Sequence, residues 1–198
     1  MKKIAVLVFI LISTLAIAQK KTVKSGYFKK LKGITEFNLV FDYTNLKVDK
    51  FETEEEFLAD KMKKREEKGT DEEFKASWFA DRENRYEPKF IESFNKRFGN
   101  GEVRVEKGLT SAKYTMKVKT TWIYPGYNVG VMRQPAKLNT TIYIYETSNP
   151  DAPILVVDYE KALGNGAMGM DYNSGYRISE AYAKLAKTLA ADVKKGIK

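Results

Sequence analysis

The chain has 198 residues, a formal net charge of +9, and neither cysteine nor histidine. Hydrophobic residues make up 43% and charged residues 31% of the sequence, values typical of a folded globular protein. The two absences exclude disulfides, thiolate nucleophiles, imidazole bases and histidine-ligated metals. They also exclude the Ser-His-Asp and Cys-His mechanisms. Carboxylates, lysine, tyrosine and backbone groups remain for chemistry, and because no motif marks a site among them we predict no catalytic residue, no metal ligand and no cofactor.

The N-terminus has the composition of a secretory signal peptide. Two lysines precede an unbroken apolar run over residues 4–12, and Ala16-Ile17-Ala18 supplies the small residues of a cleavage site. The apolar run is shorter than the roughly 20 residues that cross a bilayer. Gln19 occupies the position at which a lipoprotein carries its cysteine. We predict a signal peptide over residues 1–18 and a periplasmic or secreted protein; an uncleaved N-terminal anchor is the alternative.

Residues 19–33 form a basic segment without any acidic residue. We interpret this segment as a basic leader that joins the signal peptide to the fold and is solvated, as chain termini commonly are. The alternative is an arm that makes a peripheral contact with an anionic membrane surface. The lysines available for that contact are Lys20, Lys21, Lys24, Lys29 and Lys30.

Residues 34–198 are predicted to form a single α+β domain. Alternating apolar residues over 36–49 indicate a strand with a bulge or bend near Thr44-Asn45, where the alternation changes phase. Thr53 and Thr70 each precede a glutamate by three residues. This spacing is a capping box and predicts a helix start at both positions.

Three further strands and a long helix are predicted in the second half of the chain. Alternating apolar residues predict strands over 114–124, 138–145 and 154–162. Residues 175–195 carry an apolar stripe at helical spacing, which includes Leu185 and Leu189. The predicted fold is therefore α+β, with an antiparallel sheet of four or five strands, helices packed on one face, and an Ala-rich C-terminal helix.

Acidic residues on the predicted strands allow hydrolysis as one chemistry, because paired carboxylates cleave glycosidic bonds without any histidine. The candidates are Glu36, Asp42, Asp158 and Glu160. No motif selects these residues among the 26 acids of the chain, so ordinary solvated or ion-paired side chains are the favoured interpretation.

The most unusual segment, residues 122–135, joins two predicted strands and is aromatic and apolar rather than polar. Its proline and glycine residues prevent a simple continuation of the strand. Exposed apolar loops mark contact sites, and tyrosine, methionine and arginine are enriched in interfaces. We predict a binding site at Tyr124, Tyr127, Met132 and Arg133. The alternative is a loop folded back over the core.

Three stretches, Tyr114–Trp122, Pro125–Gly130 and Arg177–Lys184, give the chain a resemblance to a family of uncharacterised exported proteins of Gram-negative bacteria. The order of its predicted elements is similar to small α+β domains of periplasmic accessory proteins, such as the N-terminal domain of the TolB-type translocation protein. The resemblance implies a role in binding and brings no catalytic residue. The chain lacks the lipobox cysteine of related outer-membrane lipoproteins, which puts membrane anchoring in doubt.

These features favour an exported, non-enzymatic binding or accessory protein of the bacterial cell envelope. The alternative is a carboxylate-dependent hydrolase that acts on envelope glycans, so the question of enzymatic activity stays open. An envelope protein or a glycan is the expected partner, and export argues against nucleic acid despite the basic charge. The sequence leaves the oligomeric state open.

Signal peptidase should cleave the chain after Ala18, because the basic start, the apolar run and the small residues stand in the required order. Intact-mass analysis of protein from periplasmic and culture fractions should give the mass of a chain that begins at Gln19. A full-length species as the main product would show that the apolar segment is an anchor.

Overall fold

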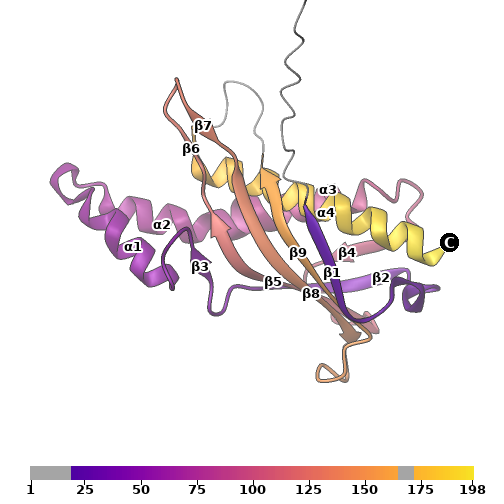
Figure 1. The fold of residues 1–198 in the computed structure, drawn as a ribbon. Helices are drawn as coiled ribbons and strands as arrows, with labels where there is room; N and C mark the ends of the chain where they lie inside the picture. The colour runs from indigo at the N-terminus through magenta and orange to yellow at the C-terminus, as the bar shows by residue number, and fades with distance from the viewer. Residues whose placement is uncertain (1–18, 165–171) are drawn as a thin grey trace, which may run out of the picture.

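The structure is a computed structural model that describes residues 19–164 and 172–198 (Figure 1). The predicted signal peptide lies outside these residues. The strands are β1 (Lys20–Gly26), β2 (Glu36–Asp42), β3 (Lys47–Val48), β4 (Arg104–Glu106), β5 (Tyr114–Tyr124), β6 (Tyr127–Asn128), β7 (Arg133–Gln134), β8 (Ala136–Glu146) and β9 (Leu155–Gly164). The α-helices are α1 (Glu54–Lys63), α2 (Asp71–Asp81), α3 (Glu87–Asn95) and α4 (Ser174–Ile197), and a π-helical turn, η3 (Arg82–Tyr86), joins α2 to α3.

The main sheet of the described residues has seven strands of mixed direction. Its order is β1-β9-β8-β5-β2-β4, and the short β3 also pairs with β5. The neighbours from β1 to β5 are antiparallel, whereas β2 runs parallel to both β5 and β4. The α+β class and the C-terminal helix are confirmed. The sheet is mixed rather than purely antiparallel, and it is larger than the predicted four or five strands.

The parallel pairing follows from the helices that lie between the strands. Residues 54–95 contain α1, α2 and α3 and separate β2 from β4 and β5 along the chain. A parallel neighbour requires a crossover of a dozen or more residues, and this helical stretch supplies it. The order of strand, helices and strand in the sequence was a signal for this connection.

Helices α3 and α4 cover one face of the sheet and lie behind the strands in Figure 1. Side chains along β5 and β8 alternate between buried and half-buried, as expected for a sheet covered on one side. Leu185 and Leu189 of α4 are fully buried, which confirms the predicted stripe. None of the described helices is long and apolar enough to cross a membrane.

Residues 20–26 belong to the sheet. They form the edge strand β1, which pairs antiparallel with β9 from Lys20↔Glu160 to Gly26↔Leu155. The 3-10 turn that follows, Phe28–Leu31, ends with a fully buried leucine. The interpretation of residues 19–33 as a solvated leader is therefore corrected. The strand escaped prediction because side chains on both of its faces are mostly exposed, so it shows no apolar alternation.

Strand β1 also pairs three of the lysines that were candidates for a membrane contact. Their ammonium groups lie 2.6–3.4 Å from carboxylate oxygens, in the pairs Lys20–Glu160, Lys21–Asp192 and Lys24–Asp158. These pairs offset charges that would otherwise attract an anionic surface. A membrane contact through this segment stays a prediction, but ion pairs already engage three of the five lysines on which it depends.

The predicted bend near Thr44-Asn45 and both predicted helix starts are confirmed. The predicted strand is interrupted between β2 and β3, where Asn45 adopts a left-handed φ of 59°. The hydroxyl of Thr53 accepts a hydrogen bond from the amide of Glu56 at 3.1 Å, which confirms the first capping box. Helix α2 also begins after Thr70 as predicted, but the Thr70 side chain makes no capping hydrogen bond, so the capping box itself is wrong at this position.

A bulge in β5 changes the face on which its last residues lie. The register against β8 shifts between Thr120 and Trp122. Before the shift Thr120 is fully buried, and after it Ile123 takes the core side. Trp122 and Tyr124 therefore lie on the half-buried face, and the predicted unbroken alternation through Tyr124 is wrong, because one extra residue reverses the parity.

Deletion of residues 19–26 should destabilise the domain, because it removes β1 and its ladder to β9. At a net 0.5–1.5 kcal/mol per lost backbone hydrogen bond, the loss is at least about 2 kcal/mol. That loss lowers the Tm of a chain of this size by about 4–8 °C in a thermal melt. The control is the double substitution Lys20→Gln and Lys24→Gln, which keeps the strand and should shift the Tm by less than about 2 °C. An unchanged Tm after the deletion would contradict a role for β1 in the fold.

Candidate functional site

The segment between β5 and β8 forms a small hairpin rather than an irregular loop. After β5 the chain turns at Pro125-Gly126, and β6 then pairs antiparallel with β7 as a separate two-stranded sheet. Figure 1 shows this hairpin projecting from the end of the main sheet. Gly126 has a φ of +66°, and a Cβ there would lie 2.4 Å from the carbonyl oxygen of Gln134. Only glycine permits this close turn at the base of the hairpin.

The four residues predicted as a binding site lie at two places on the hairpin. Tyr124 and Tyr127 are half-buried at its base. Met132 and Arg133 are exposed near its tip. The structure therefore brings the two tyrosines together and separates them from the methionine and the arginine.

Arg177 attaches the base of the hairpin to the first turns of α4. Its guanidinium donates to the carbonyl oxygens of Pro125 and Gly126 at 3.1 Å and of Tyr172 at 3.0 Å. The residue is only 4% exposed. Close by, β9 meets α4 at Gly164, where a Cβ would lie 1.9 Å from the carbonyl oxygen of Arg177. The hairpin base, the end of β9 and the start of α4 therefore form one packed unit.

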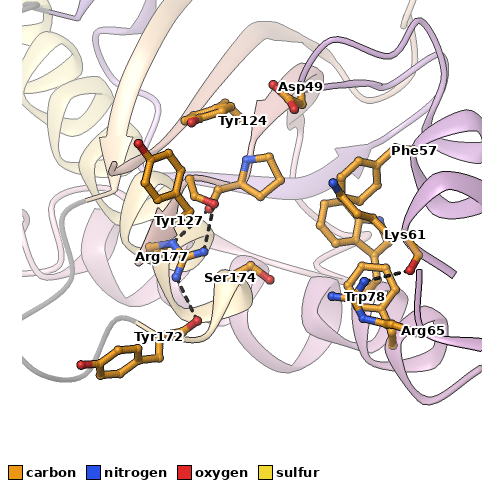
Figure 2. A pocket seen from close by; sticks show the side chains of 13 residues that line it. Asp49, Phe57, Lys61, Arg65, Trp78, Tyr124, Tyr127, Tyr172, Ser174 and Arg177 are labelled. Atoms are coloured by element: carbon orange, nitrogen blue, oxygen red, sulfur yellow. Dashed lines mark hydrogen bonds between the residues drawn. The ribbon is translucent and has the colours of Figure 1, made fainter. Parts of the chain in front are cut away.

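A pocket of about 360 Å³ lies between the base of the hairpin and the α1–α2 pair (Figure 2). Figure 2 shows Tyr124, Tyr127 and Arg177 on one side of the pocket and the side chains from α1 and α2 on the other. The described lining residues are Asp49, Phe57, Lys61, Arg65, Phe74, Trp78, Tyr124, Pro125, Gly126, Tyr127, Tyr172, Ser174 and Arg177. We call this hollow the aromatic–cationic pocket.

Two cations of the pocket lie against aromatic rings. The guanidinium carbon of Arg65 is 4.1 Å from the ring centroid of Phe74, and the ammonium of Lys61 is 5.4 Å from that of Phe57. Lys61 also lies 3.4 Å from the carboxylate of Asp60. Arg65 donates to the carbonyl oxygen of Lys61 and makes no ion pair with any described residue. A stacked guanidinium without an acidic partner can accept an anion.

The remaining polar groups of the pocket favour an anionic ligand further. Asp49 is the one acid among the described lining residues, against Lys61, Arg65 and Arg177. Burial raises the pKa of Tyr124, and the nearby carboxylate of Asp49 adds to that effect. The Tyr124 hydroxyl therefore stays protonated at neutral pH. It can donate a hydrogen bond to a ligand oxygen.

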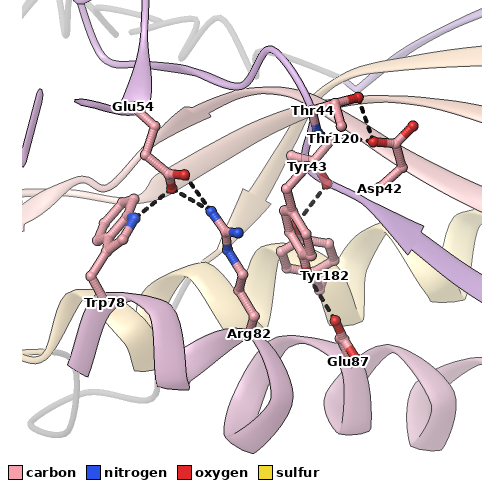
Figure 3. Close-up of polar contacts among 9 residues, drawn as sticks. All are labelled: Asp42, Tyr43, Thr44, Glu54, Trp78, Arg82, Glu87, Thr120 and Tyr182. Carbon is pink, nitrogen blue, oxygen red and sulfur yellow. Dashed lines mark hydrogen bonds and ion pairs between the residues drawn. The ribbon is translucent and has the colours of Figure 1, made fainter. Parts of the chain in front are cut away.

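The wall formed by α1 and α2 is held from behind by a buried carboxylate (Figure 3). The indole nitrogen of Trp78 donates to Glu54 Oε1 at 2.6 Å, and the guanidinium of Arg82 forms an ion pair with the same carboxylate. Phe57 packs against Trp78 with ring centroids 4.8 Å apart. These contacts join the start of α1 to the end of α2 and fix the rings that line the pocket.

A second polar cluster in Figure 3 supports the core and does not face the pocket. Tyr182 of α4 shares a 2.6 Å hydrogen bond with Thr120, and the Tyr43 hydroxyl lies 3.4 Å from Glu87. Glu87 also forms an ion pair with Lys107. Burial raises the pKa of Tyr182 and of Tyr43 well above the usual range, so neither hydroxyl ionises at neutral pH. We assign this cluster a structural role.

The four carboxylates considered for hydrolysis lie outside the aromatic–cationic pocket. Glu36 and Asp42 lie on β2, and Asp158 and Glu160 lie on β9. Two strands separate β2 from β9, which places a carboxylate of β2 about 14 Å from one of β9, too far apart for the two to form a glycosidase pair. Hydrogen bonds from Thr44 outweigh the effect of burial and lower the pKa of Asp42, so it is ionised at neutral pH.

The other acids of this set have partners. Glu36 lies 3.0 Å from a guanidinium nitrogen of Arg104, while Asp158 and Glu160 are paired with the lysines of β1. Among the described residues, no group of three acids is placed to hold a metal ion.

Comparison with known proteins gives little similarity. No family model matches the chain, and no curated protein matches it. Among solved structures, the chain is similar to the PelC dodecamer from Paraburkholderia phytofirmans, with a TM-score of 0.36 and 10% identity over 84% of this chain and 97% of that one. A single-substitution variant of that PelC dodecamer gives the same TM-score and identity over 91% of this chain and 98% of that one. These values carry no inference about function, and the resemblance to exported families stays a prediction.

Two of the three tyrosines that line the pocket, Tyr124 and Tyr127, were among the predicted binding residues, whereas Tyr172 and the cations Lys61 and Arg65 were not. Lys61 and Arg65 come from α1 and the residues after it, more than fifty positions before the hairpin. Basic residues in the last turn of a helix are ordinary complements of the helix dipole, so Lys61 gives no sign of a binding site in the sequence. The four-residue spacing of Lys61 and Arg65 is a weak signal in the sequence, since residues four apart on a helix lie on the same side.

Glu54→Ala should destabilise the protein, because it leaves Arg82 and the indole of Trp78 without their shared acceptor. We expect a loss of about 2–3 kcal/mol, below the value for a fully buried pair because Arg82 is partly exposed. Urea unfolding measures it. Glu54→Gln keeps an acceptor for the indole and should cost less than Glu54→Ala. Equal costs for the two variants would show that the indole bond contributes nothing.

Proposed function

We propose that the protein is an exported, non-enzymatic binding protein of the cell envelope. We also propose that its ligand is a planar or saccharide ring that carries an anionic group such as a carboxylate. The ligand lies in the aromatic–cationic pocket, either as a small molecule or as one unit of a larger glycan. The observation that carries the proposal is the guanidinium of Arg65, stacked on Phe74 at the pocket and without an acidic partner among the described residues.

The shape and composition of the pocket support binding of a planar or saccharide ring. Aromatic rings provide flat apolar faces, and guanidinium groups provide directed donors for a carboxylate. Tyr127 at the hairpin base and Tyr172 before α4 add ring faces from the side opposite Arg65, and Tyr172 is 66% exposed. A few placed polar groups in a mostly apolar hollow are the usual composition of a ligand site.

The predicted site residues keep a place in this proposal. Tyr124 and Tyr127 contact the ligand, with Tyr124 donating a hydrogen bond from its protonated hydroxyl. Met132 and Arg133 lie farther along the hairpin and take no part in the pocket. Pairing of the four strand carboxylates with lysine, arginine or hydroxyl groups favours binding over hydrolysis.

Binding is tested by titration of the chain that begins at Gln19 with three probes, followed through tryptophan fluorescence, because Trp78 lines the pocket. The probes are an oligogalacturonate, a neutral galactose oligosaccharide of the same length, and an aromatic carboxylate. At least one acidic probe should bind. The affinity for the neutral sugar should be lower by about tenfold or more. Arg65→Gln should weaken binding by about tenfold or more, since a hydrogen bond to a charged group contributes about 1.5–3 kcal/mol.

The matched control is Arg97→Gln, which removes an exposed arginine that does not line the pocket and should leave the affinity unchanged. Equal affinity of Arg65→Gln and the unchanged chain for every acidic probe would contradict the proposal. Release of shorter fragments from the oligogalacturonate would favour the hydrolase alternative.

A further inference from the structure

The tip of the β6–β7 hairpin gathers three exposed apolar side chains. Val129 is 65% exposed, Val131 is 94% exposed and Met132 is 59% exposed. We call residues 129–132 the hairpin tip. Single exposed apolar residues are ordinary on protein surfaces, but three together at a projecting turn indicate a contact.

The backbone of the hairpin tip is hydrogen-bonded within the hairpin. The amide of Val129 donates to the carbonyl oxygen of Met132 at 3.0 Å, and the amide of Val131 donates to that of Val129 at 3.1 Å. The amide of Gly130 donates to the side-chain oxygen of Asn128 at 2.9 Å. Backbone donors that enter lipid without a partner are costly. The hairpin tip can therefore leave water without exposing these three donors.

The charge beside the hairpin tip suits an anionic surface. Between Glu106 and Glu146 the chain contains no acidic residue, and Arg133 and Lys137 are the basic residues of this stretch that lie beyond the end of β5, on the hairpin and just after it. Arg133 directly follows the hairpin tip and is exposed. Long basic side chains beside an apolar tip can lie along it while their charged ends stay at the level of lipid headgroups.

Tyrosines complete this arrangement at the hairpin base. Tyr127 opens β6, and Lys137 lies over the ring of Tyr124 at 5.2 Å. Tyrosine is one of the residues enriched where protein meets the membrane interface. By contrast, three lysines of β1 are already ion-paired, so the hairpin offers the better contact.

We propose that the hairpin tip inserts into the surface of an anionic lipid bilayer, with Val129, Val131 and Met132 at the acyl boundary and Arg133 among the headgroups. A projecting turn penetrates a fluid surface more readily than it fits a flat protein face. Because only three apolar side chains insert, the contact is weak and reversible. The proposal stands on the hairpin tip alone and does not depend on any ligand of the aromatic–cationic pocket.

The test is co-sedimentation of the chain that begins at Gln19 with vesicles, so that the apolar N-terminal run cannot contribute. Phosphatidylcholine vesicles with and without phosphatidylglycerol are compared at low and high salt. The protein should sediment with the phosphatidylglycerol vesicles, and salt should weaken binding. Val131→Asp should weaken binding by about tenfold or more, because an aspartate loses the apolar contact and is repelled by anionic lipid.

The matched control is Val23→Asp, the same change at an exposed valine of β1, which should bind as the unchanged chain does. Circular dichroism and thermal melts establish that both variants are folded. Failure of the unchanged chain to bind at low salt would overturn the proposal, as would equal binding by Val131→Asp. If Val131→Asp instead converts an oligomer to a monomer in gel filtration and leaves vesicle binding unchanged, the hairpin tip is a contact between copies of the chain and the proposal is wrong.

Discussion

Both proposed binding surfaces depend on one buried guanidinium, that of Arg177. The start of a helix is an unfavourable place for a cation, because the helix dipole is positive there. Three backbone carbonyl oxygens offset this cost, and two of them belong to the turn at Pro125-Gly126. The same interaction that satisfies the charge therefore sets the angle at which the hairpin leaves the sheet. Both the near wall of the aromatic–cationic pocket and the direction of the hairpin tip follow from it.

The opposite wall of the pocket is stabilised in a different way. The α1–α2 pair extends beyond the sheet in Figure 1 and is held by a cluster of rings. Phe57 contacts Phe51, Phe74 and Trp78. The carboxylate of Glu54 adds a polar anchor at the edge of this cluster. Aromatic pairs prefer particular ring geometries in addition to burying apolar area. This cluster can therefore hold α1 and α2 in place although the two helices do not lie on the sheet.

Much of the fold could be predicted from the sequence because most of its elements carry a periodic pattern. β5, β8 and α4 each bury one face, and alternation or helical spacing marked all three. β1 could not be found in this way, since an edge strand with two exposed faces has no apolar period. Tyr124 and Tyr127 were singled out because an apolar connection between strands is unusual. Lys61 and Arg65 were not, because a cation on a helix surface gives no sign of the ring or the hollow beside it until the helices are placed.

The edge strand at the start of the chain also constrains the order of folding. Strand β1 is an edge strand that pairs with β9, for example at Lys20↔Glu160, so it can join the sheet only after β9 has formed. Closing a loop of this length is entropically costly and slow compared with forming the β5–β8–β9 meander, whose strands are neighbours along the chain. A chain synthesised from its N-terminus therefore keeps β1 unpaired until nearly all of its residues have emerged. The exposed edge of β9 is the last part of the sheet to be covered, and during that interval it is the place where another chain could pair instead.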